Sequence, residues 1–414
     1  MTVDRPNQPH DPMTRGAESD ERDSARAWFR VAAAFLAGAV SFGVLYSFGV
    51  FLKPIAREFH ANVVEASAFF SLTAIVYYFF GAFAGRLSDL FGPRLIVACG
   101  AAAVGLGLFF TAFAHRLWFG YLAYASGVGV GGACVYVPTL AAVGGWFVKR
   151  RNAALGIATA GNGIGSIAFP PLAAALIGRL GWRATDLVFA FLASALLFVC
   201  AFLVGPPMAA RAEGGAPPRV RDLIYSREFV ILYLSWVLVS SALFETIVFL
   251  PSFARAHGAG RIAAAALVST IGGAGVAGRL AFGPAGDRLE ALALFKVTCL
   301  LMALSYAIWI FLPSYGWLLV FAVIFGVSYG TRFAALPAVL IDYFGIPGLG
   351  TTLGLFLTAS GLAALIGPML AGLAIDLEGG FKGAVLFAFA MGLLGFAALL
   401  PLRGRGGRER DPLR

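Results

Sequence analysis

The sequence is dominated by twelve long apolar segments that are separated by short polar ones. A helix needs about 20 apolar residues to cross a lipid bilayer. The segments comprise residues 28–52, 66–87, 95–114, 117–143, 152–178, 184–204, 229–253, 262–283, 291–312, 317–343, 351–375 and 381–402. Of all residues, 60% are hydrophobic and 13% are charged, whereas soluble proteins carry about 25% charged residues. The pattern therefore predicts an all-α, multi-pass protein of the lipid bilayer with twelve transmembrane helices.

Polar segments divide the chain into two halves. Residues 1–26 are rich in Asp, Arg and Pro and are expected to form a disordered tail. A first six-helix bundle is predicted over 27–204, and a polar linker over 205–228 separates it from a second bundle over 229–403. Residues 404–414 form a basic tail.

The distribution of Lys and Arg indicates the orientation in the membrane. The segments on the side of the two termini, counted with the ends of the adjoining spans, hold 21 of the 31 Lys and Arg residues, and those on the other side hold 8. Cytoplasmic loops carry an excess of these residues. We therefore expect both termini in the cytoplasm and the protein in the cell membrane.

The two halves are repeats of each other. Three positions recur 199 residues later, namely Gly127, Gly131 and Pro138 as Gly326, Gly330 and Pro337. A second set, which begins at Gly156, recurs 198 residues later from Gly354. Six helices repeated in the same orientation predict two pseudo-symmetric bundles that are related by an axis along the membrane normal.

Few residues could hold a metal or serve an enzyme. The four cysteines lie singly in apolar segments and the four histidines lie in tails or loops, so we expect no metal site and no cofactor. The spans lack a mid-span histidine or paired acids for catalysis, and an ATP-binding G-x-x-x-x-G-K-[ST] loop is absent. The net charge of +10 is spread over loops and tails, which fits membrane topology better than nucleic-acid binding. The sequence therefore predicts no enzyme.

The segment GRLSDLFGPR, residues 85–94, resembles the signature G-x-L-x-D-R-x-G-R-R of the major facilitator superfamily. The residues that match are Gly85, Leu87, Asp89, Gly92 and Arg94. Gly85 lets two helices touch, and Asp89 can accept hydrogen bonds from a helix N-terminus or from an arginine. We expect a charged latch that closes one side of a transporter, with a mere turn and charge anchor as the alternative. Asp287 and Arg288 form a degraded copy in the second half.

A longer stretch, YVPTLAAVGGWFVKRRNAALGIATAGNGIG, resembles the fourth-to-fifth helix signature of monocarboxylate transporters and of their bacterial relatives, which include oxalate/formate antiporters. The match is carried by Lys149, Arg150, Arg151, Ala154, Gly156, Ala158, Ala160 and Gly161. The resemblance covers nearly the whole chain outside the tails and implies the major facilitator fold. It also implies a membrane transporter that needs no cofactor.

This resemblance has departures at positions that carry charge in the relatives. Their first-helix lysine aligns with Tyr46, and their eighth-helix aspartate aligns with Gly275, whereas the arginine four residues later is retained as Arg279. The eleventh-helix lysine of the oxalate transporter aligns with Ser360. The usual proton-carrying acid and the usual second cation are therefore replaced.

Three charged residues lie deep in the apolar segments, namely Glu245, Arg279 and Arg332. An arginine at the centre of a membrane helix costs about 2.5–3.5 kcal/mol on insertion scales. With a rise of about 1.5 Å per residue, Arg332 lies near mid-span, Glu245 roughly 6 Å outward and Arg279 roughly 9 Å inward. One interpretation is a structural Glu245–Arg332 ion pair. The other is that Arg279 or Arg332 binds a substrate carboxylate bidentately, with Glu245 as the proton-coupling residue.

Four uncharged polar residues align with cavity positions of the relatives, namely Tyr46, Tyr136, Asn162 and Ser360. Each could hydrogen-bond a small anion or satisfy a contact between helices. Tyr77, Tyr78 and Tyr329 are expected to be packing residues.

The expected function is secondary active transport of a small carboxylate of the monocarboxylate type by alternating access, with protons as the coupled ion. Two alternatives stay open within transport, an anion exchanger of the oxalate/formate type and an efflux pump for another small organic compound. A sensor is a further alternative, but the chain offers no soluble output domain besides its short tails.

Overall fold

The computed structural model describes residues 24–205, 220–378 and 380–404, and within these ranges it contains helices and no strands. Twelve of the described helices are long and apolar enough to cross a membrane. The predicted all-α fold with twelve transmembrane helices is confirmed. The predicted tails lie almost wholly outside the described residues, as does most of the linker.

The first bundle is built from six membrane spans. Its elements are α2 (Ala25–Glu58), α3 (Val63–Phe91), α4 (Pro93–Ala112), α5 (Leu117–Tyr124), η1 (Ala125–Val130), α6 (Gly131–Trp146), α7 (Arg151–Leu180) and α8 (Trp182–Val204). The fourth span combines α5, η1 and α6, and η1 is a π-helix at its centre. Gly127 of η1 lies against Gly107 of α4, so two backbones touch where neither residue has a side chain. Apolar periodicity does not predict this π-helical turn.

The second bundle repeats the arrangement. Its elements are α11 (Arg227–Ala256), α12 (Arg261–Arg288), α13 (Ala291–Phe311), α14 (Tyr315–Phe344), α15 (Leu349–Glu378) and α16 (Lys382–Leu399). A short helix, α10 (Val220–Ile224), lies within the predicted linker. Several helices extend past the apolar segments, because polar residues at a helix end reach the membrane surface. For example, α2 continues to Glu58 although its apolar segment ends at residue 52.

Local sequence signals determine where helices begin and end. Asn62 caps α3 by accepting a hydrogen bond from the Glu65 backbone at 2.8 Å, and the Glu65 carboxylate accepts one from the Asn62 backbone at 2.9 Å. Gly92 separates α3 from α4 with φ at +87°, a conformation that favours glycine. Pro93 then occupies the first turn of α4, where its missing N–H is not needed.

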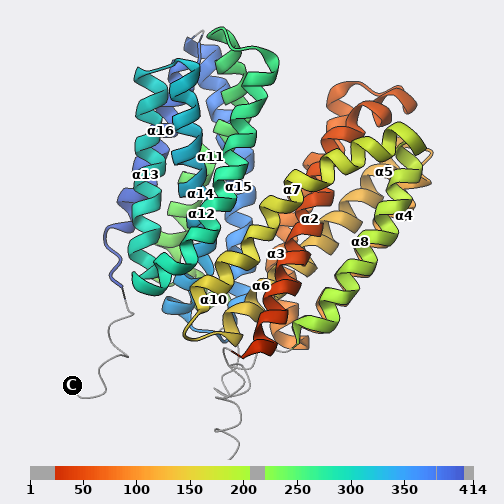
Figure 1. The fold of residues 1–414 in the computed structure, drawn as a ribbon, viewed down its shortest axis with the longest axis horizontal. Helices are drawn as coiled ribbons and strands as arrows, with labels where there is room; N and C mark the ends of the chain where they lie inside the picture. Colours follow the sequence, from red (N-terminus) through yellow and green to blue (C-terminus); the bar gives the residue numbers. More distant parts are fainter. Residues whose placement is uncertain (1–23, 206–219, 379, 405–414) are drawn as a thin grey trace, which may run out of the picture.

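The two bundles lie side by side and are closest at one end (Figure 1). At that end α2 begins and the linker helix α10 lies, and the chain leaves α16 on the same side (Figure 1). We call this end the terminal face. Toward the opposite end, α2 and α7 of the first bundle diverge from the second bundle (Figure 1).

Glycines make the closest contacts between the bundles near the terminal face. A Cβ on Gly85 of α3 would collide with the backbone carbonyl of Gly350 on α15. A Cβ on Gly156 of α7 would likewise collide with the carbonyl of Arg279 on α12. The bundles therefore close against each other backbone to backbone, as small residues allow in membrane proteins.

Candidate functional site

Arg279 lies on α12 where the two bundles meet. Its side chain is 3% exposed, and its guanidinium carbon lies 5.0 Å from the centre of the Tyr329 ring and 5.9 Å from that of Phe333. Arg279 makes no hydrogen bond or ion pair with the residues that the structure describes, and its buried Nε has no partner there. A buried cation without a counter-charge is costly. The side chain is therefore a candidate for binding an anion.

Five tyrosines from both bundles surround this guanidinium. They are Tyr46 on α2, Tyr77 and Tyr78 on α3, Tyr136 on α6 and Tyr329 on α14, and we call them the tyrosine cluster. The hydroxyls of Tyr46 and Tyr136 lie within electrostatic reach of Arg279 and of Tyr329. The hydroxyls of Tyr77 and Tyr78 lie within reach of Tyr46 and Tyr136. Tyr77, Tyr78 and Tyr329 were expected to be packing residues, and Tyr77 does pack on the rings of Phe42 and Tyr78, whereas Tyr329 also lies beside the Arg279 guanidinium.

Asn162 on α7 supplies another polar group to the site. Its Nδ2 donates a hydrogen bond to the Tyr136 hydroxyl at 3.1 Å. Its Oδ1 and the Tyr77 hydroxyl are buried and have no partner within the described ranges. The next residue, Gly163, leaves room for Arg279, since a Cβ at Gly163 would stand 3.5 Å from Nη1. The unpaired polar groups of α3 and α7 thus gather near the unpaired cation of α12.

Arg332 lies apart from this group. Its Nη2 donates to the Trp236 carbonyl at 3.3 Å and to the Ser240 hydroxyl at 3.2 Å, both on α11. Its guanidinium carbon lies 4.0 Å from the centre of the Trp236 ring. The side chain is fully buried and points into the second bundle toward α11 and α13, where Cys299 lies beside it. The structure therefore does not bring Arg332 together with Arg279.

The Glu245–Arg332 ion pair, one of the two sequence interpretations, is not formed. Glu245 is fully buried, and neither carboxyl oxygen has a partner among the residues described. Glu245 lies five residues beyond Ser240 on α11, which rotates it by about 140° around the helix. It lies within electrostatic reach of Tyr306 on α13 instead. Arg332 of α14 therefore contacts one side of α11, and the Glu245 carboxylate points to another side.

Ser360 already makes a hydrogen bond within the protein. Its hydroxyl accepts a hydrogen bond of 2.7 Å from Trp236 Nε1. Both residues line a cavity of about 30 Å³, to which the first bundle contributes Tyr136 and Leu140 and the second also contributes Phe333. This volume suffices for about one or two water molecules. Its walls are mostly apolar.

Asp89 links the bundles at the terminal face. Its Oδ2 accepts hydrogen bonds from the Thr351 backbone at 2.7 Å and from the Thr351 hydroxyl at 2.6 Å. Its Oδ1 accepts one from the Gly350 backbone at 3.2 Å. These donors belong to the N-terminus of α15, which attracts negative charge. The arrangement suits the predicted latch, although its gating role stays a prediction.

The other predicted latch residues are not all part of this contact. Gly85 lies directly against Gly350, one turn from Asp89, and Gly92 forms the turn after α3. Arg94 instead stacks within the first bundle, with its guanidinium carbon 5.1 Å from the centre of the Phe202 ring. Arg288 is the exposed last residue of α12. The side chain of Asp287 lies outside the described residues.

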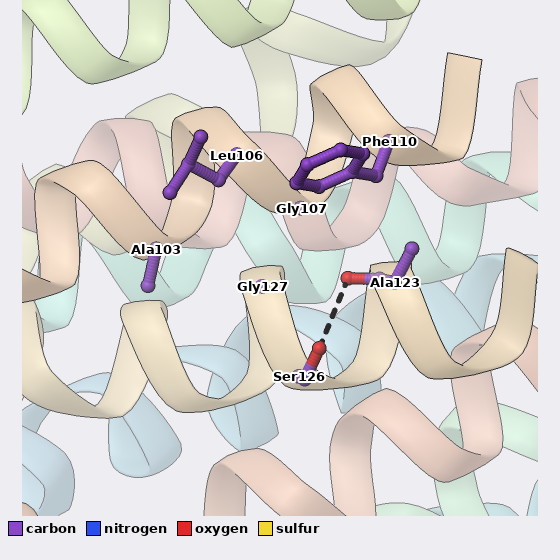
Figure 2. A pocket seen from close by; sticks show the side chains of 7 residues that line it. All are labelled: Ala103, Leu106, Gly107, Phe110, Ala123, Ser126 and Gly127. Carbon is purple, nitrogen blue, oxygen red and sulfur yellow. Dashed lines mark hydrogen bonds between the residues drawn. The ribbon is translucent and has the colours of Figure 1, made fainter. Parts of the chain in front are cut away.

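A groove of about 230 Å³ lies away from this region, between α4 and the fourth span (Figure 2). It is lined by Ala103, Leu106, Gly107, Phe110, Ala123, Ser126 and Gly127. Leu106 and Phe110 are exposed, and the Ser126 hydroxyl bonds to the backbone carbonyl of Leu122 at 2.6 Å. The groove therefore has no free polar group aimed into it and faces the membrane side of the first bundle. The described residues also contain no group of three His, Cys, Asp or Glu that could hold a metal.

Comparison with known proteins identifies the family. The sequence profile of the Major Facilitator Superfamily matches residues 34–345 and 246–413. The chain belongs to the Major Facilitator Superfamily.

Curated relatives within this superfamily are transporters. Monocarboxylate transporter 13 of Rattus norvegicus is 29% identical over 384 residues, which cover 92% of this chain and 90% of the relative. Monocarboxylate transporter 11 of Mus musculus is 30% identical over 379 residues, which cover 88% and 84%. The fucose:proton symporter FucP of E. coli matches in structure with a TM-score of 0.72 at 14% identity, over 90% of this chain and 98% of that one. This major facilitator protein is therefore a membrane transporter related to monocarboxylate transporters, and not an enzyme.

Sequence analysis missed several residues of this transporter that matter for its chemistry. Trp236 connects Arg332 to Ser360, and no motif marks it. Asp186 on α8 is 2% exposed and its Oδ2 has no partner in the described chain. It lies at the edge of an apolar segment, so its burial was not predictable from the pattern of apolar residues. The members of the tyrosine cluster lie on α2, α3, α6 and α14. A count of the tyrosines in each predicted helix could have found them.

Proposed function

We propose that this protein is a secondary active transporter that binds a monocarboxylate anion at Arg279 and moves it across the membrane by alternating access. The observation that supports this function is the buried guanidinium of Arg279, which has no counter-charge among the residues that the structure describes. A guanidinium binds a carboxylate through two parallel hydrogen bonds. Because Nε is buried, the carboxylate would approach the two terminal nitrogens. Tyr46 and Tyr136 would lie close enough to donate further bonds.

The contacts between the bundles at one end and their divergence at the other support alternating access. At the terminal face, Asp89 and the glycine contacts hold α3 against α15. Toward the opposite end the bundles diverge (Figure 1), and Tyr46 is 41% exposed. The proposed cycle closes this opposite end around the bound anion and then releases the contacts at the terminal face.

We further infer that the terminal face is cytoplasmic and that the protein resides in the cell membrane. The excess of Lys and Arg on the side of the termini supports this orientation. The state described here would then be open to the outside, with its latch closed on the cytoplasmic side.

Protons are the proposed coupled ion, and Glu245 is the proposed proton-binding residue. Its carboxyl group is buried in the second bundle with no ion-pair partner in the described ranges. Burying an ionised carboxylate without a partner is costly, so these surroundings suit a protonated group. Glu245 makes no contact with an arginine here, so coupling would act through the movement of α11 and not through release of a salt bridge.

Uptake into proteoliposomes tests the function. The purified full chain should exchange labelled monocarboxylates, and an imposed pH gradient should drive their accumulation. Arg279→Lys should reduce uptake at least tenfold, because a point charge cannot reproduce the two-pronged bond. Arg179→Lys is the matched control, since Arg179 is an exposed residue at the end of α7.

Different results would contradict different parts of the proposal. Normal binding of carboxylate to Arg279→Ala protein in calorimetry would remove Arg279 from the site. Exchange that ignores the pH gradient would favour an anion exchanger. Transport of other organic compounds without any carboxylate would favour an efflux pump.

A further inference from the structure

The charges near Arg279 limit the number of negative charges that a ligand can carry there. Arg332, the other cation deep in the spans, points away toward α11 and α13 and is held by Trp236 and Ser240. Ser360 offers a hydroxyl that already accepts a bond from Trp236. A second carboxylate would therefore meet no cation in the part of the site that the structure describes.

Aromatic rings form one wall of the space beside Arg279. The ring of Tyr46 lies 6.0 Å from that of Phe42 and 6.4 Å from that of Phe70, measured between centres. Tyr46 is 41% exposed while its neighbours are half-buried. Its ring thus stands at the open side of the wall, within electrostatic reach of Arg279.

Glycines form the facing surface on α12. Gly272 lies seven residues before Arg279, which places it on the same side of the helix and about 10 Å toward the open end. Gly275, one turn from Arg279, lies so close that a Cβ would stand 3.3 Å from Nη1. A Cβ at Gly272 would meet nothing within 4 Å. Gly275 is itself packed against Tyr329 and Gly326 of α14, so the open part of this glycine surface lies at Gly272.

We propose, on the basis of the function proposed above, that the substrate is an aromatic monocarboxylate. Its carboxylate binds Arg279, and its ring lies between the Tyr46 wall and the glycine surface of α12. Stacking on an aromatic ring and close approach to a backbone both suit a flat apolar body. A small aliphatic acid would leave this space filled with water, and a dicarboxylate would carry a charge that finds no cation.

Competition for uptake tests the substrate class. The full chain in proteoliposomes exchanges labelled benzoate, and unlabelled acids compete. We expect benzoate and phenylacetate to compete at concentrations at least tenfold below those of acetate and lactate, and succinate to compete no better than acetate. Equal competition by acetate or lactate, or strong competition by succinate, would overturn the aromatic assignment. The proposed function would survive either result, whereas it would fail if no carboxylate is exchanged or competes.

Two substitutions locate the ring. Gly272→Leu should fill the space and raise the concentration of benzoate needed for competition at least tenfold, with acetate changed less than twofold. Gly273→Leu is the control, because Gly273 is exposed and rotated by about 100° from Gly272. Tyr46→Ala, at an exposed side chain, removes a hydroxyl that any carboxylate could use and the ring that only an aromatic acid could use. It should therefore weaken aromatic competitors more than acetate, and it serves if Gly272→Leu does not fold. An equal loss for acetate and benzoate in both variants would overturn the proposed position of the ring.

Discussion

The contact between Asp89 and the start of α15 gives the sharpest prediction about the transport cycle. Asp89→Asn keeps one carbonyl oxygen but turns an NH₂ group toward backbone donors. Hydrogen bonds to a charged group contribute about 1.5–3 kcal/mol each, neutral ones about half as much. A negative charge at a helix N-terminus adds about 0.3–1 kcal/mol. Loss of the bond from Gly350 and weakening of the two from Thr351 should therefore destabilise the closed terminal face by about 3 kcal/mol, roughly a hundredfold in population.

Labelling of a single cysteine measures this change. Leu140 lines the small cavity between the bundles and is 5% exposed. In a background without the four native cysteines, Leu140→Cys should react with a thiol reagent far faster when Asp89→Asn is added. Thr351→Val removes one hydroxyl donor and should increase the rate only about fivefold, equivalent to about 1 kcal/mol.

Matched variants separate the latch from a general effect of charge. Asp376→Asn neutralises an exposed acid near the other end of α15 and should leave the labelling rate unchanged. Thr351→Ser keeps the hydroxyl and should also behave like the parent. If Asp89→Asn protein of normal thermal stability labels no faster than the parent, Asp89 does not hold the face closed.

Three further predictions concern coupling, stability and orientation. Glu245→Gln should still exchange carboxylates but lose accumulation driven by pH, and well-folded Glu245→Gln protein that still accumulates substrate would exclude the coupling role. Arg332→Met removes two hydrogen bonds to α11 together with a buried charge, a replacement that is often neutral or stabilising, so the thermal midpoint should not fall and the protein should keep its carboxylate affinity; a tenfold loss of affinity would instead place Arg332 in the site. Cysteines placed in 205–228 and in 254–261 should react with impermeant reagents from opposite sides of the membrane, and labelling from the same side would refute the topology.

The sequence predicted the fold well because membrane burial acts on whole segments. Twelve apolar stretches define twelve helices, since a backbone in lipid must satisfy its hydrogen bonds internally. Gly85 was predicted to let two helices touch, and the structure places it against the backbone of α15 at Gly350. The π-helix at Ala125–Val130 was not predictable, because it changes the helix by one residue while leaving its apolar composition intact.

The site was predicted only in part because depth along a span does not determine the direction of a side chain. Arg279, Glu245 and Arg332 were expected near one another from their depths. In the structure, Arg332 contacts one side of α11 and the Glu245 carboxylate points to another. Neither residue contacts Arg279. Helix rotation is set by packing among neighbours. Of the tyrosine cluster, Tyr46 and Tyr136 were predicted as candidate site residues and Tyr329 was not, since a tyrosine alone also suits a packing position.

The two buried arginines of this transporter differ in the hydrogen bonds that they make with the protein. Arg332 donates to a carbonyl and a hydroxyl and lies over the face of Trp236, while its buried Nε and Nη1 have no partner among the described residues. Arg279 has two aromatic rings nearby and no hydrogen-bond partner among the described residues. Its family neighbour, an aspartate, is replaced by Gly275, which removes the acid that could have paired with it. We therefore propose that the anion that pairs with Arg279 is the substrate, and that the lack of a carboxylate beside Arg279 in the described residues leaves room for the ring that we propose the substrate carries.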